Sequence, residues 1–224
     1  VEICHEMMIP SGMGEELQRQ REMCIDPYTR VANRSKELVP MEVKTVLTLE
    51  KSGKGLHVAT TICNQAKDHR VRVVMPTGLN TSTHLADSAF EVVKRNNRHN
   101  DTWTNPCGCE RQQCFAAMED ETNGLLVANR GLYEYEVLAD EENAIAVTLL
   151  RSVAEMGDWG YFPTPKAQQI GTFTLDFEVV PYVAGKTGEA FAEGYAFQQD
   201  LTAAQAGLSK AWLRKPGQVK PELV

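Results

Sequence analysis

The sequence has no apolar run of about 18 residues, and its first residues do not form the basic-then-apolar pattern of a secretion signal. It also lacks a basic excess, because 23 lysines and arginines face 30 aspartates and glutamates and the net charge is -7. These absences argue against a membrane-spanning segment and against a nucleic acid or an anionic membrane as partner. We therefore expect a cytoplasmic protein with no nucleic-acid and no membrane partner.

Paired metal-binding cysteines are missing as well. The six cysteines are Cys4, Cys24, Cys63, Cys107, Cys109 and Cys114. The last three lie near His99, but their gaps of one and four residues are not those of zinc knuckles. We expect no metal ligand and no cofactor in this chain. A chain of this length can build a large core without disulfides, so we also expect reduced thiols.

Motifs of catalysis and phosphate binding are absent too. The sequence contains no G-x-S-x-G, no P-loop and no G-x-G-x-x-G, and its five histidines form no recognisable local pair with a serine or cysteine. Two acidic runs, residues 119–121 and 140–142, occur at turn-like positions. Their carboxylates should face solvent and repel one another rather than form the buried pair of a glycosidase. We therefore expect no catalytic residue in this chain.

Alternation of apolar and polar residues is the dominant pattern that the sequence does contain. Residues 41–50 are apolar or β-branched at every odd position, and residues 56–62 alternate again after a Ser-Gly-Lys-Gly loop. Residues 69–75 predict a strand that ends at Pro76, and residues 171–180 alternate most clearly of all. The pattern predicts an all-β fold with few short helices.

Helical patterns are restricted to two segments. Residues 14–24 are rich in helix formers, and residues 186–196 have helical composition interrupted by glycine. We expect three parts: residues 1–40 as a lead-in with a possible short helix, residues 41–200 as a β-sandwich, and residues 201–224 as a tail or linker toward missing C-terminal segments. The long segment 96–113 shows no regular pattern.

The most informative segment is residues 123–137, in which two strand-like runs flank Asn129-Arg130-Gly131. Glycine permits a tight backbone at this point. A planar guanidinium suits recognition of carboxylates or sugar hydroxyls, but these residues alone favour a surface arginine of a hairpin.

Five segments in the same order extend this observation to a family. They are residues 64–78, residues 86–95, residues 124–137, residues 149–153 and residues 165–177. Together they resemble the C-terminal β-domain of the glycoside hydrolase family 38 enzymes, which are retaining, zinc-dependent α-mannosidases. The resemblance is closest to the bacterial branch that includes mannosylglycerate-hydrolase-like enzymes.

The resemblance implies a large antiparallel β-sandwich of the galactose-mutarotase-like (supersandwich) type. It implies an N-terminal α/β catalytic domain as the partner, with the zinc and the nucleophile located there, and a mannoside as substrate. In that family an arginine of an Arg-Gly-Leu turn reaches the catalytic cleft. The matching residues here are Arg130 and the preceding Asn129, which are therefore the expected substrate-binding residues.

Alternatives from other classes remain open. One is a stand-alone carbohydrate-binding sandwich in which Trp103, Trp159, Tyr161 and Phe162 stack on sugars. Another is a zinc-stabilised interaction module. A β-domain separated from its partner should also expose an apolar patch, so a homodimer is possible.

Overall fold

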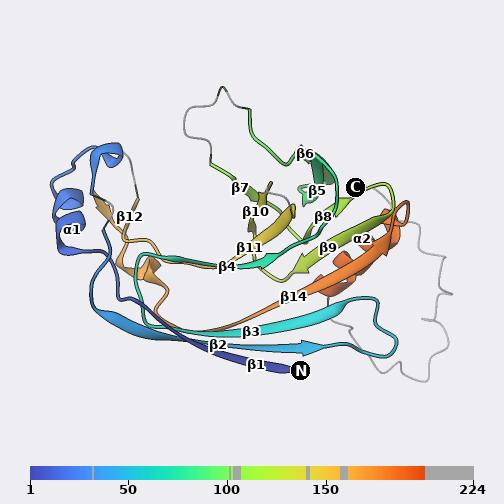
Figure 1. Ribbon diagram of the computed structural model, residues 1–224, viewed down its shortest axis with the longest axis horizontal. Coiled ribbons are helices and arrows are strands. Elements are labelled where there is room, and N and C mark those ends of the chain that lie inside the picture. Colours follow the sequence, from blue (N-terminus) through green and yellow to red (C-terminus); the bar gives the residue numbers. More distant parts are fainter. Residues whose placement is uncertain (32, 101, 103–106, 140–141, 157–160, 200–224) are drawn as a thin grey trace, which may run out of the picture.

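The computed structural model of the chain describes residues 1–31, 33–100, 102, 107–139, 142–156 and 161–199. A large, curved sheet lies against a smaller sheet, and short helices occupy two ends of the molecule (Figure 1). The strands of the large sheet are β1 (Glu2–Pro10), β2 (Leu38–Thr48), β3 (Leu56–Asn64), β5 (Thr83–Ser88), β6 (Glu91–Asn96), β8 (Phe115–Glu119), β9 (Asn123–Asn129) and β14 (Gly171–Val183). Those of the smaller sheet are β4 (Arg70–Met75), β7 (Cys109–Arg111), β10 (Glu134–Leu138) and β11 (Ala144–Arg151).

The strand order of the large sheet is β1-β2-β3-β14-β9-β8-β5-β6, and that of the smaller sheet is β4-β11-β10-β7. A third, two-stranded sheet pairs β12 (Glu155–Met156) with β13 (Phe162–Pro163). Neighbouring strands pair in antiparallel fashion throughout these sheets. The predicted all-β antiparallel sandwich is therefore confirmed.

The alternating residues 41–62 form the hairpin that their pattern predicts. β2 and β3 form the predicted hairpin, in which Leu47 is paired with Val58 and Val43 with Ile62. Alternate residues of β3 are buried from Val58 to Asn64, because one face of the strand points toward the core. The predicted end of the third strand is also confirmed, since β4 stops at Met75, directly before Pro76.

β8 and β9 are buried on both faces, and this explains their nearly continuous apolar sequences. Ala116, Met118 and Val127 belong to the core between the two sheets. Phe115 and Leu126 point the other way, into a second core. Both strands therefore lie at the centre of the molecule, with a packed layer on either side.

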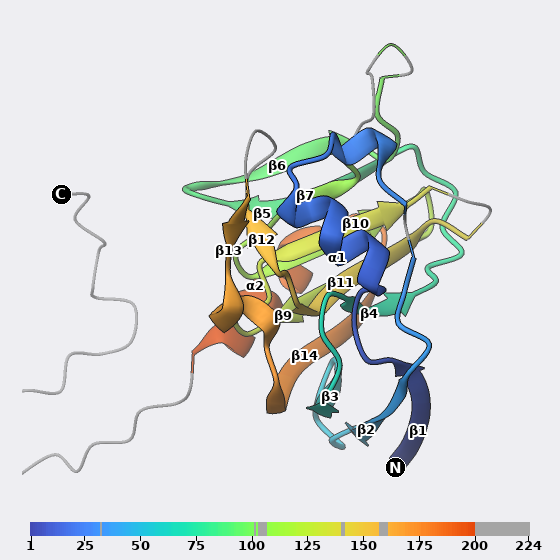
Figure 2. The same ribbon diagram turned by 90° about the vertical axis from the view of Figure 1, so that its left-hand side faces the viewer.

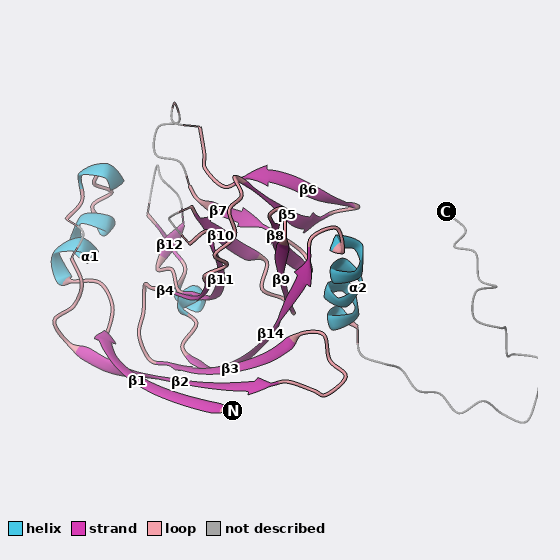
Figure 3. Ribbon diagram, turned by 45° about the vertical axis from the view of Figure 1, so that its right-hand side comes forward, coloured by secondary structure: helices cyan, strands magenta, loops and turns pink. Residues whose placement is uncertain are grey.

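The second core is closed by α2 (Thr187–Gln198), which lies on the face of the large sheet remote from the smaller sheet (Figure 3). Phe115 stacks on Phe191 of the helix, with ring centroids 4.8 Å apart. Gly194 allows the close approach, because a Cβ at this position would lie 2.7 Å from Phe115 Cδ1. The helix predicted near residues 186–196 is thus present despite its glycines, and Gly194 serves the packing.

The opposite end of the molecule carries α1 (Glu15–Glu22), which Figure 2 shows at the front. Glu155 of β12 ties this end together, since its Oε1 accepts hydrogen bonds from Arg21 Nε and Arg30 Nη1, both at 2.7 Å. Only 7% of the Glu155 side chain is exposed. Two short 3-10 turns, Pro27–Thr29 and Pro165–Gln168, complete the elements.

Two parts of the structure differ from the sequence-based expectation. The lead-in at residues 1–40 contains the helix, but it also contributes β1, which pairs with β2 along nine residues. The segment 96–113 contains the short strand β7. The division into three parts remains a prediction, and the expected tail at 201–224 lies outside the described residues. In the part of the chain that is described, no helix is long and apolar enough to cross a membrane.

Candidate functional site

The connection from β9 to β10 carries both residues expected to bind substrate. β9 belongs to the large sheet and β10 to the smaller one, so residues 129–132 cross from one layer to the other. Gly131 has a φ of +75°, a left-handed conformation that glycine adopts without steric cost. We call these four residues the crossing turn.

Asn129 holds the crossing turn from within. Its side chain is fully buried. Its Oδ1 accepts a hydrogen bond from Leu132 N at 2.7 Å, and its Nδ2 donates to Cys114 O at 3.2 Å. The amide group of Asn129 therefore positions the backbone around Arg130.

Two glutamines from other parts of the chain also bind the backbone of this turn. Gln112, which follows β7, donates from Nε2 to Leu132 O at 2.5 Å. Gln198, at the end of α2, donates from Nε2 to Asn129 O. Three separate parts of the chain thus fix the backbone on both sides of Arg130, so the turn is rigid where it carries the arginine.

Arg130 itself lies on the surface against the end of α2. Its Nε donates to Phe197 O at 2.7 Å, and its guanidinium carbon lies 4.8 Å from the centre of the Phe197 ring. The backbone N of Arg130 donates to Asp176 O at 3.2 Å. The Phe197 carbonyl and ring fix the direction of the guanidinium, and the bond to Asp176 of β14 fixes the backbone that carries it.

Arg130 faces a recess of about 340 Å³ between α2, β14 and the β2–β3 hairpin. His57 Nε2 and Asp176 Oδ1 lie 3.3 Å apart on its wall. Burial raises the pKa of Glu178, and the nearby charge of Glu193 adds to the effect. The recess is lined by Thr48, Glu50, Gly53, Gly55, His57, Arg130, Asp176, Glu178 and Phe197.

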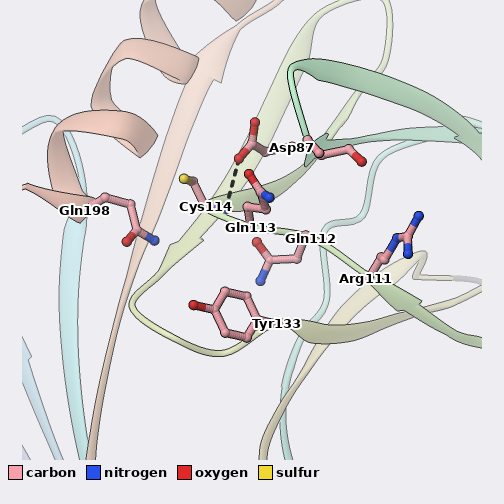
Figure 4. A pocket seen from close by; sticks show the side chains of 9 residues that line it. Asp87, Arg111, Gln112, Gln113, Cys114, Tyr133 and Gln198 are labelled. Carbon is pink, nitrogen blue, oxygen red and sulfur yellow. Dashed lines mark hydrogen bonds between the residues drawn. The ribbon is translucent and has the colours of Figure 1, made fainter.

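A larger polar pocket of about 590 Å³ is lined by Gln112 and Gln198, the two glutamines that hold the crossing turn (Figure 4). Gln198 stands at one side of this pocket and Arg111 at the other, with Gln112 and Tyr133 between them. Planar amides, a guanidinium and a phenol are groups that hydrogen-bond sugar hydroxyls. The polar pocket is lined by Asp87, Ser88, Ala89, Arg111, Gln112, Gln113, Cys114, Tyr133 and Gln198.

Asp87 and Cys114 form the back of the polar pocket. Asp87 accepts hydrogen bonds from Tyr195 Oη at 2.7 Å and from Cys114 N at 3.1 Å. Burial, together with the Asp87 carboxylate, raises the pKa of the Cys114 thiol to about 11. This thiol is protonated at neutral pH, so Cys114 has no nucleophilic role there.

Tyr135 connects the crossing turn to the far edge of the large sheet. Its fully buried ring contacts His84 edge-on. Its hydroxyl lies 2.8 Å from His84 Nε2 and accepts a hydrogen bond from Arg95 Nη1 at 2.9 Å. Burial lowers the pKa of His84, so a neutral imidazole accepts from Tyr135 and donates from Nδ1 to Asn97 Oδ1 at 3.0 Å.

Replacing Tyr135 by phenylalanine is expected to lower the free energy of unfolding by about 1 to 1.5 kcal/mol, because the change leaves His84 Nε2 without its partner inside the core. Urea denaturation of the purified chain at pH 7 measures the loss. Tyr133→Phe is the matched control, since Tyr133 is 63% exposed and its variant should unfold like the wild type. Equal stability of the two variants would contradict the assigned role of the Tyr135 hydroxyl.

The other candidates from the sequence have local roles or lie outside the described residues. Asp120, from the first acidic run, accepts hydrogen bonds from Asn123 N and Thr122 N, which lower its pKa to about 2. It is a turn residue. In the second run Asp140 and Glu141 are not described, and neither are Trp103 and Trp159. Tyr161 is half-buried near α1, away from both recesses.

The proposed cysteine–histidine cluster forms no metal site within the described ranges, where no three or more histidine, cysteine, aspartate or glutamate side chains come together suitably. All six cysteines are free thiols.

Sequence reasoning missed most residues of the polar pocket. Asp87, Gln112 and Gln198 come from three elements far apart in the sequence and belong to no local motif. The only indication was indirect, because Gln112 lies in the irregular segment 96–113, where binding residues are frequent. Their meeting depends on the tertiary fold.

The chain is similar to known proteins in both sequence and structure. The model of the family described as "Glycosyl hydrolases family 38 C-terminal domain" matches residues 18–159. A curated protein of Halalkalibacterium halodurans, named "Putative mannosylglycerate hydrolase", is 41% identical over 182 residues, which are 81% of this chain and 20% of that protein.

Two solved structures from Enterococcus faecalis are also similar. An α-mannosidase superimposes with a TM-score of 0.87 at 41% identity, over 92% of this chain and 23% of the other. A protein of glycosyl hydrolase family 38 gives a TM-score of 0.84 at 39% identity, over 95% of this chain and 24% of the other. The chain thus spans about a fifth to a quarter of the length of these relatives, and it belongs to the C-terminal domain family of the family 38 glycosyl hydrolases.

Proposed function

We propose that this chain is the non-catalytic β-sandwich portion of a retaining, zinc-dependent α-mannosidase. In this proposal it supports the active site of an N-terminal α/β domain and contributes Arg130 to the binding of the mannoside. The observation that carries the proposal is the crossing turn, in which buried Asn129 and two glutamines fix the backbone around one surface arginine. The relatives named as an α-mannosidase and a mannosylglycerate hydrolase supply the substrate class.

The chemistry of Arg130 suits such a role. A guanidinium carries five N–H donors in one plane, so a single arginine side chain can bind several acceptors at once, and Nε of Arg130 already donates to Phe197 O. Sugar hydroxyls and the carboxylate of a mannosylglycerate are acceptors of this kind. In this proposal Asn129 acts through Arg130, because its side chain positions the turn that carries the arginine. Substrate would thus meet a donor whose direction is already fixed, which reduces the entropic cost of binding.

Zinc has no place among the described residues of this chain. They bring together no group of three histidine, cysteine, aspartate or glutamate side chains that could hold it. In the proposed enzyme the metal and the two carboxylates that retaining hydrolysis requires belong to the partner domain. The part of the present chain is to bind and orient substrate at the rim of that domain.

Exposed apolar residues support a docking role. Met7 and Met8 of β1 are 42% and 54% exposed, and Leu38 of β2 is 52% exposed. Exposed apolar side chains on an edge strand and its neighbour suit contact with a protein partner. We assign them to contact with the N-terminal domain or to a homodimer. A cytoplasmic location is also part of the proposal, because the exposed thiols of Cys4 and Cys24 suit a reducing compartment.

Arg130→Ala in the full-length enzyme is expected to lower kcat/KM for an α-mannoside at least about tenfold, which corresponds to about 1.4 kcal/mol of lost transition-state binding. Arg130→Lys should recover part of the activity, because it keeps the charge and loses the planar donors. Steady-state kinetics with a chromogenic mannoside measures both. An unchanged kcat/KM in Arg130→Ala would remove Arg130 from the substrate site.

Two controls accompany this experiment. Arg19→Ala removes an arginine whose side chain is 64% exposed and should leave kcat/KM unchanged. Thermal unfolding of Arg130→Ala separates a lost substrate contact from a loosened α2, because Arg130 packs on Phe197. The isolated chain, freed of contaminating enzymes, should release no mannose. Release of mannose by the isolated chain would overturn its assignment as non-catalytic.

A stand-alone carbohydrate-binding function is the second candidate. The polar pocket favours it, because Tyr133 is 63% exposed there beside amide side chains. Calorimetric titration of the isolated chain with mannose and mannosides tests it. Saturable binding that is lost in Tyr133→Ala would support this candidate, whereas absence of heat at millimolar sugar would leave the first proposal in place.

A further inference from the structure

Cys107 and Cys109 flank Gly108 at the beginning of β7, outside both recesses described above. Cys107 is exposed and Cys109 is half-buried. Cys109 is paired with Glu136 of β10 in the smaller sheet. Burial raises the pKa of Cys109, and the neighbouring Cys107 thiol adds to the rise.

Two arginines surround the Cys109 sulfur. Arg70 Nη1 donates to Cys109 Sγ at 2.7 Å, and Arg151 Nη2 lies 3.5 Å from the same atom. The same arginines bind carboxylates of β10, Arg70 to Glu136 at 2.9 Å and Arg151 to Glu134 at 2.9 Å. Guanidinium groups in contact with a sulfur stabilise its thiolate, so Arg70 opposes the burial that raises the pKa of Cys109 overall.

Gly108 makes the pair compact. A Cβ on Gly108 would lie 2.6 Å from Glu136 Oε1, so a larger residue would displace the carboxylate that Arg70 and Arg72 bind. Glycine also gives the backbone between the cysteines the freedom that a ring closed over two neighbouring positions needs. Burial raises the pKa of Cys109 although Arg70 opposes the effect, which makes exposed Cys107 the thiol that first meets an external reagent.

We propose that Cys107 and Cys109 are a reversible redox pair that closes to an intramolecular disulfide in exchange with a small-molecule disulfide such as glutathione disulfide. The Cys107 thiolate attacks one sulfur of glutathione disulfide, forms a mixed disulfide and expels one glutathione thiolate. The Cys109 thiolate then attacks Cys107 Sγ, forms the internal bond and expels the second glutathione thiolate. The two thiol protons pass to the two released glutathiones, and the protein loses two electrons.

Closure has a structural consequence for the smaller sheet. A disulfide sulfur is a weaker acceptor than a free cysteine sulfur, so oxidation weakens the contacts of Arg70 and Arg151 with Cys109. β7 pairs with β10, and Gln112 directly after β7 holds the crossing turn through Leu132 O. Oxidation therefore acts on the same short strand that supports the turn of Arg130.

The test equilibrates the full-length protein with glutathione at increasing ratios of disulfide to thiol, blocks free thiols with an alkylating reagent, and identifies the cysteine-bearing peptides by mass spectrometry. The expected result is a peptide with an internal 107–109 bond at ratios that leave Cys4 and Cys24 reduced. A Cys107 that stays reduced, or that accumulates as a stable glutathione adduct in the wild type, overturns the proposal.

Three variants sharpen the test. Cys109→Ser should trap Cys107 as the glutathione adduct, and Cys107→Ser should leave Cys109 reduced. Arg151→Gln removes one donor that stabilises the reduced form, so half-oxidation should occur at a disulfide ratio about two- to tenfold lower. An unchanged midpoint in Arg151→Gln would overturn the part assigned to the arginines. None of these measurements uses glycosidase activity, so their outcome is independent of the proposed function.

Discussion

Replacing Glu155 by glutamine is expected to lower the free energy of unfolding of the purified chain by about 3 kcal/mol. A single carboxylate oxygen receives both Arg21 and Arg30 at 2.7 Å, and the two arginine side chains are only 15% and 12% exposed. A neutral amide would leave two guanidinium groups in a desolvated place without their counter-charge. Asp68, at 3.8 Å from Arg21, is too distant to replace it fully.

The loss should depend on pH. Burial alone would raise the pKa of Glu155, but hydrogen bonds from Arg21 and Arg30 outweigh it and leave the pKa below the ordinary value of 4.5. A pKa that is depressed in the folded state gives stability that is complete above the unfolded pKa and disappears as pH falls through the folded one. The difference between wild type and Glu155→Gln should therefore be full at pH 7 and shrink below about pH 4.5.

Urea denaturation at pH 7 and at pH 3.5 measures both effects. Glu16→Gln is the matched control, because Glu16 also binds an arginine, Arg19, at 2.8 Å. This pair lies on an exposed part of α1, the helix that contains Arg21. An exposed pair of this kind is worth less than about 1 kcal/mol. Similar losses of stability in the two variants would contradict the stabilising role of Glu155 between Arg21 and Arg30. A loss in Glu155→Gln that does not change with pH would contradict it as well.

Gly124→Ala is expected to destabilise the chain by about 2 kcal/mol. Gly124 of β9 is paired with Tyr182 of β14, whose ring covers it. A Cβ on Gly124 would lie 2.2 Å from Tyr182 Cζ and 2.3 Å from Tyr182 Cε2. The ring would have to leave its place, losing contact with the second core and the hydrogen bond from Tyr182 Oη to Met118 O at 3.3 Å.

A double-mutant cycle isolates this contact. In a Tyr182→Ala background the obstacle is gone, so Gly124→Ala should be neutral or slightly stabilising, since glycine is a poor strand residue. Thermal and urea unfolding of the four proteins give the coupling energy. An equal cost of Gly124→Ala in both backgrounds would show that the ring does not determine the need for glycine.

The strands that sequence analysis predicts well are those with one face in the core. β2, β3 and the first half of β14 alternate because one side meets solvent. Farther along β14 the pattern fails, since Phe177 and Val180 are buried on opposite faces, the latter beneath α2. β1 gives no such pattern, because most of its side chains are exposed. It becomes a strand through its pairing with β2.

The candidate site likewise contains residues that a local sequence pattern reveals and residues that only the tertiary structure reveals. Arg130 is visible in the sequence because a glycine turn between two apolar runs is a local feature. The function of Asn129 is not, since only its burial and its bond to Leu132 N reveal that it supports the turn. Asp87, Gln112 and Gln198 meet through long-range packing. Local patterns cannot report contacts that depend on elements more than 20 residues apart.

The place of β14 bears on how the protein is made. This strand joins β3 to β9 at the middle of the large sheet, yet it is encoded after every other strand of that sheet. While the ribosome has not yet released residues 171–183, the growing polypeptide holds two half-sheets, each with an open inner edge of backbone donors and acceptors. Closure must then wait for late-arriving, non-local pairing, which is slow and exposes nascent chains to misassembly. The last strand to emerge is the one that turns two fragments into a single sheet.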